Sequence, residues 1–165
     1  MDANVLDELT PERAIELMPE LGERSLDISE LKGGITNKLY RVKDDRDGDY
    51  VFRLYGAKTE MFIDRDMEMQ TMKLLEPFMV SPKVVKYLPE KSVTVIEFIE
   101  GYTLKNEDFL KEELWENIIR PVKTVHESGV SIPKIFDPLT EVKRFHDLLL
   151  EINPEYPEFG IVGTI

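Results

Sequence analysis

The chain has 165 residues, and 42% of them are hydrophobic, which is enough for a buried core and too many for wholesale disorder. Its 21 Lys and Arg residues face 33 Asp and Glu residues, a formal net charge of -12, so no nucleic-acid partner is expected. There is no cysteine, which excludes disulfides, zinc thiolates and cysteine nucleophiles. The acidic first residues predict no signal peptide, and the apolar runs are too short to span a bilayer, so we expect a soluble, cytoplasmic protein.

A helix and a hairpin are predicted in the first third of the chain. Thr10-Pro11 is typical of an N-cap and first helical residue, and an apolar stripe continues to Leu21 before Gly22. Residues 25–31 alternate loosely and predict a first strand, and two β-rich runs, 37–43 and 50–55, predict a hairpin.

The acidic turn of this hairpin, 44–49, contains Gly48 between two aspartates. The glycine does not fall at the position that a calcium-binding loop requires. We therefore expect a solvated hairpin tip.

The rest of the chain changes from strands to helices. Helical spacing predicts a helix over 60–76, ended by Pro77, and two strands follow over 83–88 and 92–99. Further helices are predicted over 106–127, with a break at Pro121, and over 140–152. We expect an α+β fold with a sheet-based lobe, residues 1–100, then a hinge and partial helical lobe, residues 101–165.

The candidate binding residues lie between Gly33 and Glu68. Gly33-Gly34 is followed by Thr36 and Asn37, whose side-chain donors beside backbone N–H groups suit phosphate oxygens, although a plain turn also explains a glycine pair. Neither a P-loop nor a GxGxxG motif occurs here.

Arg53 and Glu68 form the second candidate feature. Arg53 lies on a predicted strand, with Phe52 and Leu54 pointing to the opposite face, and Glu68 lies on the next predicted helix. A cation on a half-buried strand needs an anionic partner, so we predict that the two residues pair. The alternatives are an arginine that reaches to water and an exposed helical acid.

His146-Asp147 looks at first like a kinase catalytic loop. In that loop a residue separates His from Asp, and an Asn follows five positions after the Asp, whereas here nothing intervenes and Asn153 comes one position too late. The apolar spacing around the pair predicts a helix. No catalytic residue is therefore assigned in this chain, and two histidines without cysteine predict no metal site.

These segments together resemble the choline/ethanolamine kinase family, within the wider aminoglycoside-phosphotransferase and protein-kinase-like fold. GGITNKLYRV is similar to the family's phosphate-binding hairpin, VFRLYG to its third strand, and IDRDME to its C-helix. SPKVV and VIEFIEGYTL resemble its fourth strand and its fifth strand with the hinge. The resemblance implies a kinase-like amino-terminal lobe, an antiparallel sheet of about five strands plus the C-helix, followed by helices that begin the carboxy-terminal lobe.

The resemblance also implies a reaction: transfer of the ATP γ-phosphoryl group, with Mg²⁺, to the hydroxyl of a small amino alcohol, choline or ethanolamine. Arg53 would contact the phosphates, Glu68 would orient Arg53, and backbone groups of Phe98 and Ile99 would hydrogen-bond the adenine. The residues implied in nucleotide binding are Lys32, Gly33, Gly34, Ile35, Thr36, Asn37, Lys38, Arg53, Glu68, Glu97, Phe98, Ile99 and Gly101.

The sequence departs from the family in the catalytic part. The family's catalytic loop resembles HNDxxxxN, a later Asp holds magnesium, and neither is found downstream of the matching segments. The expectation is an amino-terminal piece of a kinase, with helices that dimerise or contact a missing lobe. A non-catalytic nucleotide-binding or interaction module, and a kinase for an aminoglycoside or sugar, stay open as alternatives.

Overall fold

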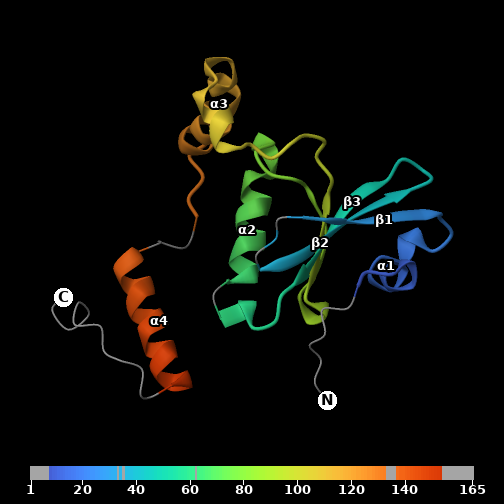
Figure 1. Ribbon diagram of the computed structural model, residues 1–165, viewed down its shortest axis with the longest axis horizontal. Coiled ribbons are helices and arrows are strands. Elements are labelled where there is room, and N and C mark those ends of the chain that lie inside the picture. Colours follow the sequence, from blue (N-terminus) through green and yellow to red (C-terminus); the bar gives the residue numbers. More distant parts are fainter. Residues whose placement is uncertain (1–7, 33, 35, 62, 133–136, 154–165) are drawn as a thin grey trace. The chain divides into compact units, whose positions relative to one another are not determined.

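The computed structural model describes residues 8–32, 34, 36–61, 63–132 and 137–153 (Figure 1). The chain divides into two compact units, Met1–Ser131 and Ile132–Ile165. The first unit holds the sheet and the helices α1 to α3, and the second holds α4. Within the described ranges, no helix is long and apolar enough to cross a membrane. The lobe boundary expected near residue 100 stays a prediction.

One antiparallel sheet forms the centre of the first unit, in the strand order β1-β2-β3-β5-β4. This arrangement confirms the expected α+β class. The strand that was predicted to continue to Ile99 ends at Glu97, which pairs with Tyr50. The Phe98 N–H still donates to the Asp49 carbonyl, but β3 begins at Asp49 and has no residue to pair with Ile99. The strands are β1 (Leu26–Leu31), β2 (Asn37–Asp44), β3 (Asp49–Tyr55), β4 (Val84–Leu88) and β5 (Val93–Glu97).

The hydrophobic core lies on one face of this sheet, under the helix α1 (Pro11–Leu17) and a 3-10 turn, Pro19–Leu21. Phe52 and Leu54 of β3 point into it, as strand alternation requires. Thr10 caps α1 as predicted, since its hydroxyl accepts from the Arg13 N–H at 3.3 Å. The prediction of one helix to Leu21 was wrong, because α1 ends at Leu17 and a separate turn begins at a proline, which has no N–H to continue the ladder.

The helix α2 (Arg65–Leu75) lies beside the sheet (Figure 1). Its residue Glu68 is hydrogen-bonded to Arg53 of β3. It starts later than the predicted Glu60, because Asp64 is its N-cap and accepts from the Met67 N–H at 2.9 Å. Residues Thr59–Met61 form a separate 3-10 turn. The helix therefore presents Arg65 and Glu68 in its first turn.

The tip of the β2–β3 turn is exposed at residues 45–47, as predicted, but a buried side chain anchors the turn from the end of β2. The Asp44 side chain is fully buried, pairs with Arg24, and accepts the N–H groups of Arg46 and Gly48 at 2.8 Å each. The left-handed residue of the turn is Asp47, with φ 64°, and not Gly48. Gly48 instead provides space, since a Cβ there would lie 2.2 Å from the Asp44 carboxylate.

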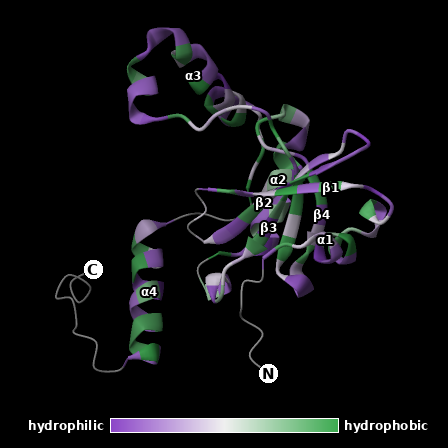
Figure 2. Cartoon of the chain, turned by 45° about the vertical axis from the view of Figure 1, so that its right-hand side comes forward, coloured by the Kyte–Doolittle hydropathy of each residue, from purple (hydrophilic) through white to green (hydrophobic). Residues whose placement is uncertain are grey.

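Two longer helices complete the described chain. A 3-10 segment, Asn106–Leu110, precedes α3 (Glu112–Glu127), so the predicted helix breaks near Lys111 and continues through Pro121, where the break was expected. In the second unit α4 (Pro138–Ile152) is capped by Asp137. Figure 2 shows apolar and polar residues alternating along α4, the pattern of an amphipathic helix.

Candidate functional site

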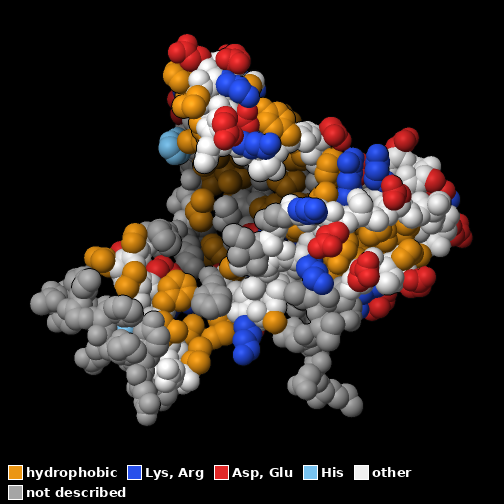
Figure 3. Space-filling view, viewed as in Figure 1, with side chains coloured by type: hydrophobic (Ala, Val, Ile, Leu, Met, Phe, Trp, Pro, Cys, Tyr) orange, Lys and Arg blue, Asp and Glu red, His pale blue; other side chains and the backbone are white. Residues whose placement is uncertain are grey.

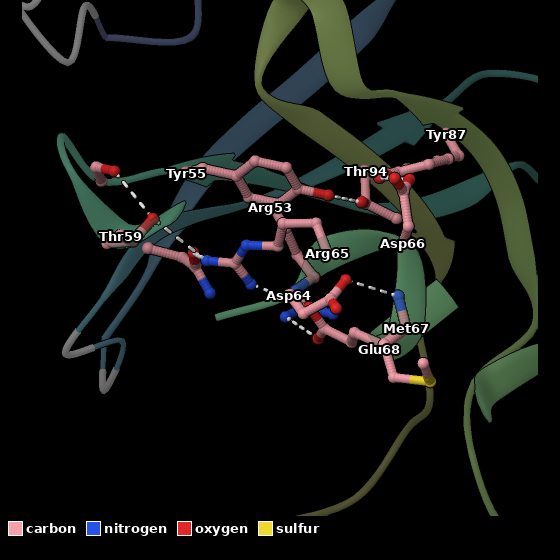
Figure 4. Close-up of polar contacts among 12 residues, drawn as sticks. Arg53, Tyr55, Thr59, Asp64, Arg65, Asp66, Met67, Glu68, Tyr87 and Thr94 are labelled. Atoms are coloured by element: carbon pink, nitrogen blue, oxygen red, sulfur yellow. Dashed lines mark hydrogen bonds and ion pairs between the residues drawn. The ribbon is translucent and has the colours of Figure 1, made fainter. Parts of the chain in front are cut away.

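The predicted pair of Arg53 and Glu68 is present. Arg53 Nη2 donates to Glu68 Oε1 at 2.6 Å, from the central strand β3 to the first turn of α2 (Figure 4). The Arg53 side chain is 17% exposed and that of Glu68 is 27% exposed. The pair is therefore half-buried, on the face of the sheet opposite the hydrophobic core, and the prediction that the two side chains meet is confirmed.

A second arginine, Arg65, shares the same carboxylate, and sequence reasoning missed it. Arg65 Nη1 donates to Glu68 Oε2 at 2.8 Å, and its Nη2 donates to Asn37 Oδ1 at 2.9 Å and to Thr59 Oγ1 at 3.3 Å. Its guanidinium also stacks over the Tyr55 ring at 4.1 Å (Figure 4). The signal in the sequence was the three-residue spacing of Arg65 and Glu68 on a helix, which places both on one face.

Glu68 stays ionised between the two arginines. Burial, the largest single influence, raises the pKa of its carboxyl, but the hydrogen bonds and charges of Arg65 and Arg53 outweigh burial and hold that pKa below its usual value. One carboxylate between two guanidinium groups leaves a net positive charge on this group of three. Such an excess suits a site that receives an anion.

The segment between β1 and β2 approaches this group at Asn37. Of the residues predicted to cover phosphates, Lys32, Gly34 and Thr36 are exposed, Asn37 and Lys38 are half-buried at the start of β2, and Gly33 and Ile35 lie outside the described residues. A Cβ at Gly34 would lie 2.2 Å from the Asn37 carbonyl oxygen. Only glycine fits there, because the backbone turns back on itself.

A second contact holds the end of this segment. The Gly56 N–H donates to the Thr36 carbonyl at 2.8 Å. A Cβ at Gly56 would lie 2.6 Å from that carbonyl oxygen, so the glycine permits the approach. Thr59 in turn donates to the Gly56 carbonyl at 2.9 Å.

The predicted adenine border begins where β5 ends, on the strand next to Arg53. The Phe98 N–H already donates to the Asp49 carbonyl at 3.0 Å, so this donor is used within the fold. Arg41 stacks over the Phe98 ring at 3.5 Å and forms two hydrogen bonds with Asp49, at 2.9 and 2.6 Å. An adenine could still meet the Phe98 carbonyl and the Ile99 N–H, and this role stays a prediction.

Two tyrosines make hydrogen bonds near the start of α2, one between two strands and one from the sheet to the helix. The Tyr55 hydroxyl is hydrogen-bonded to Thr94 of β5, and the Tyr87 hydroxyl donates to Asp66 Oδ1 at 2.7 Å. Burial first, and then Asp66, raise the pKa of the Tyr87 hydroxyl well above its ordinary value. Tyr87 therefore joins Asp66 of α2 to the sheet, and Tyr55 contacts the same helix through the Arg65 guanidinium (Figure 4).

Neither a metal site nor a catalytic loop is found in the part of the chain that the structure describes. Among these residues no group of three His, Cys, Asp or Glu side chains could hold a metal ion. His146 and Asp147 lie on α4, as the apolar spacing predicted, with their side chains 3.7 Å apart.

Comparison with known proteins assigns the chain to a family. A sequence profile described as choline/ethanolamine kinase matches residues 28–157. The chain belongs to this family. Ethanolamine kinase 2 of Mus musculus is 30% identical over 124 residues, which cover 72% of this chain and 31% of that protein. A probable ethanolamine kinase of Nematostella vectensis is 40% identical over 72 residues, 42% of this chain and 21% of that protein.

Solved structures share the fold. Choline kinase LicA from Streptococcus pneumoniae superposes with a TM-score of 0.73 at 25% identity, over 92% of this chain and 52% of LicA. A Plasmodium vivax ethanolamine kinase, at 23% identity and a TM-score of 0.67, shows the same fold over 92% of this chain and 45% of that one. The kinase-like choline/ethanolamine kinase fold is thereby shown. The chain spans about a third of the length of Mus musculus ethanolamine kinase 2 and about half of LicA.

Proposed function

We propose that this chain forms the nucleotide-binding lobe of an ATP-dependent kinase that phosphorylates the hydroxyl of a small amino alcohol, ethanolamine or choline. The observation that carries the proposal is the contact of Arg53 with Glu68 beside the 32–37 segment. In kinase-like lobes a strand cation held by a helix carboxylate meets the nucleotide phosphates. Family membership supplies the acceptor class, since the curated relatives that match are ethanolamine kinases.

The remaining roles follow from this placement. The residues 32–38 would cover the phosphates, Arg53 would contact them, and Glu97 to Gly101 would border the adenine. LicA has been solved in complex with AMP, which supports a nucleotide as the ligand of this fold. Magnesium is the expected metal partner, with no ligand assigned here. A cytoplasmic location and the lobe boundary near residue 100 belong to the same proposal.

Nucleotide binding is tested first, on the 165-residue chain, by NMR titration with ATP, which measures weak binding. We expect Arg53→Gln to weaken ATP binding by about tenfold, because a charge-assisted hydrogen bond to phosphate is lost. Arg46→Gln is the matched control, since Arg46 is an exposed arginine at the β2–β3 turn. Equal ATP affinity of the two variants would contradict the role of Arg53.

Turnover is tested on the protein encoded by the whole reading frame that contains these residues. With ATP and magnesium, we expect phosphorylation of ethanolamine or choline and none of an aminoglycoside. ATP binding without phosphorylation of any acceptor would favour a non-catalytic nucleotide-binding module. The 165-residue chain assayed alone should give no turnover, because no HNDxxxxN motif occurs in it; turnover would bring His146 and Asp147 back as candidates.

A further inference from the structure

We propose that Arg65 is a positioning residue that ties the phosphate-covering segment, residues 32–37, to the Arg53–Glu68 pair. This inference rests on the proposed function. Arg65 would act through Asn37, by holding its amide oxygen so that the amide nitrogen is left to donate to a phosphate oxygen.

The position of Arg65 is unusual for a helical arginine. It is the first residue of α2, where the positive end of the helix dipole disfavours a cation. Its side chain is nevertheless only 10% exposed, so it gains little from water. Contacts within the fold must compensate, and they are the carboxylate of Glu68, the oxygens of Asn37 and Thr59, and the ring of Tyr55.

These contacts connect three parts of the site. Asn37 is the last residue of the phosphate-covering segment and the first residue of β2. Thr59 donates to the Gly56 carbonyl, and the Gly56 N–H donates to Thr36, so a second chain of hydrogen bonds leads from Arg65 to the same segment. Glu68, the third part, is bonded through its other oxygen to Arg53. A shift of Arg65 would therefore disturb both the segment and the Glu68 carboxylate that holds Arg53.

The chemistry of the guanidinium fixes the orientation of Asn37. Arginine has five N–H donors and no acceptor, so it can bind only the oxygen of the Asn37 amide. The NH₂ group of the Asn37 amide must then point away from Arg65. It is a hydrogen-bond donor close to the net positive charge of Arg53, Arg65 and Glu68. A phosphate oxygen is an acceptor that matches both features.

Three variants of the 165-residue chain test the proposal, each measured for ATP affinity, melting temperature and amide hydrogen exchange in residues 36–39. Arg65→Gln should weaken ATP binding by about tenfold and speed exchange, because the ties to Asn37 and Glu68 are lost. Arg65→Lys keeps a positive charge near Glu68 but lacks the planar fork and the stacking surface of arginine, so its ATP affinity should stay below that of wild type. Asn37→Asp keeps the acceptor for Arg65 and removes the donor, so it should lower ATP affinity while exchange stays slow.

Tyr87→Phe is the matched control. It removes the hydrogen bond from Tyr87 to Asp66, which docks the same turn of α2 but does not reach the phosphate-covering segment. It should change neither ATP affinity nor exchange in residues 36–39. If Arg65→Gln behaves like Tyr87→Phe in both readouts, Arg65 is an ordinary structural arginine and the inference is wrong.

The two levels of the proposal fail differently. If the wild-type chain binds no ATP, nucleotide binding by this chain fails, and hydrogen exchange still decides whether Arg65 holds the segment. If wild type binds ATP and Arg65→Gln binds it equally well, only the role of Arg65 fails.

Discussion

At the scale of single residues, Glu68 determines how the site responds to pH. Its pKa is lowered from the ordinary value of 4.5, because the hydrogen bonds from Arg65 and Arg53 outweigh the opposing effect of burial. The unfolded chain, whose glutamate has the ordinary pKa, binds a proton more readily than the folded chain does. Stability contributed by Glu68 is therefore fully present above pH 4.5 and is lost as the pH falls through the lowered pKa.

We predict that Glu68→Gln lowers the free energy of unfolding at pH 7 by about 1–2 kcal/mol, since it leaves two arginines without their shared carboxylate in a partly screened site. Urea denaturation at a series of pH values measures this difference between variant and wild type. The difference should be constant at neutral pH and shrink below pH 4.5, as the wild-type carboxyl takes up a proton. Glu60→Gln, at an exposed glutamate ahead of the same helix, is the control. A difference that is independent of pH would contradict the ionised state of Glu68.

At the scale of elements, the β2–β3 turn is built around a buried carboxylate. Burial raises the pKa of Asp44, but hydrogen bonds from Arg24 and from the turn N–H groups outweigh it, so that its net pKa is lowered. Asp44→Ala should destabilise the chain by about 2 kcal/mol, because Arg24 loses its partner and two N–H groups lose their acceptor. Asp45→Ala, at the exposed neighbour, is the control, and urea denaturation compares the two. Equal stability of both variants would mean that the Asp44 carboxylate does not hold the turn together.

The elements also show what sequence patterns could and could not predict. Strand alternation predicts that Arg53 and Phe52 point to opposite faces of the sheet, and the helical pattern that follows contains Glu68. The pair of Arg53 and Glu68 was therefore predictable. The start of α2 was not, because it depends on whether Asp64 caps the helix, which is a choice between neighbouring polar residues. Arg65 was missed because its role comes from Asn37 and Tyr55, which only the folded sheet brings to it.

The helices show a similar limit. Pro121 was expected to break the helix, since proline removes one hydrogen bond and crowds the preceding turn. The helix α3 nevertheless continues through Pro121, from Glu112 to Glu127. A helix of this length has many other backbone hydrogen bonds besides the one that the proline removes. The helix of the second unit was predicted over 140–152 from its apolar spacing, but α4 begins two residues earlier, at Pro138, because Asp137 caps it and a proline fits the first helical position.

At the scale of the whole molecule, both long helices expose large apolar side chains, as the sequence led us to expect. On α3, Ile119 and Val122 are 57% and 53% exposed, and orange side chains cover part of this helix in Figure 3. On α4, Leu149 is exposed as well. Ile118 of α3 and Leu148 of α4 are half-buried. Patches of this kind on a described surface are typical of interaction sites.

We therefore predict that the 165-residue chain self-associates as its concentration rises, through an apolar stripe on α3 that contains Trp115, Ile119 and Val122. These positions are spaced by four and three residues, so they lie on one side of the helix. Sedimentation and light scattering over a range of concentrations should give an average mass above that of the monomer. The double variant Ile119→Lys and Val122→Lys should stay monomeric, because two charges in the stripe must be desolvated for it to be covered. Asn117→Lys adds charge to the same helix away from the stripe and should associate like wild type. A wild-type chain that is a clean monomer at high concentration would mean that these side chains are not a contact surface between copies of this chain.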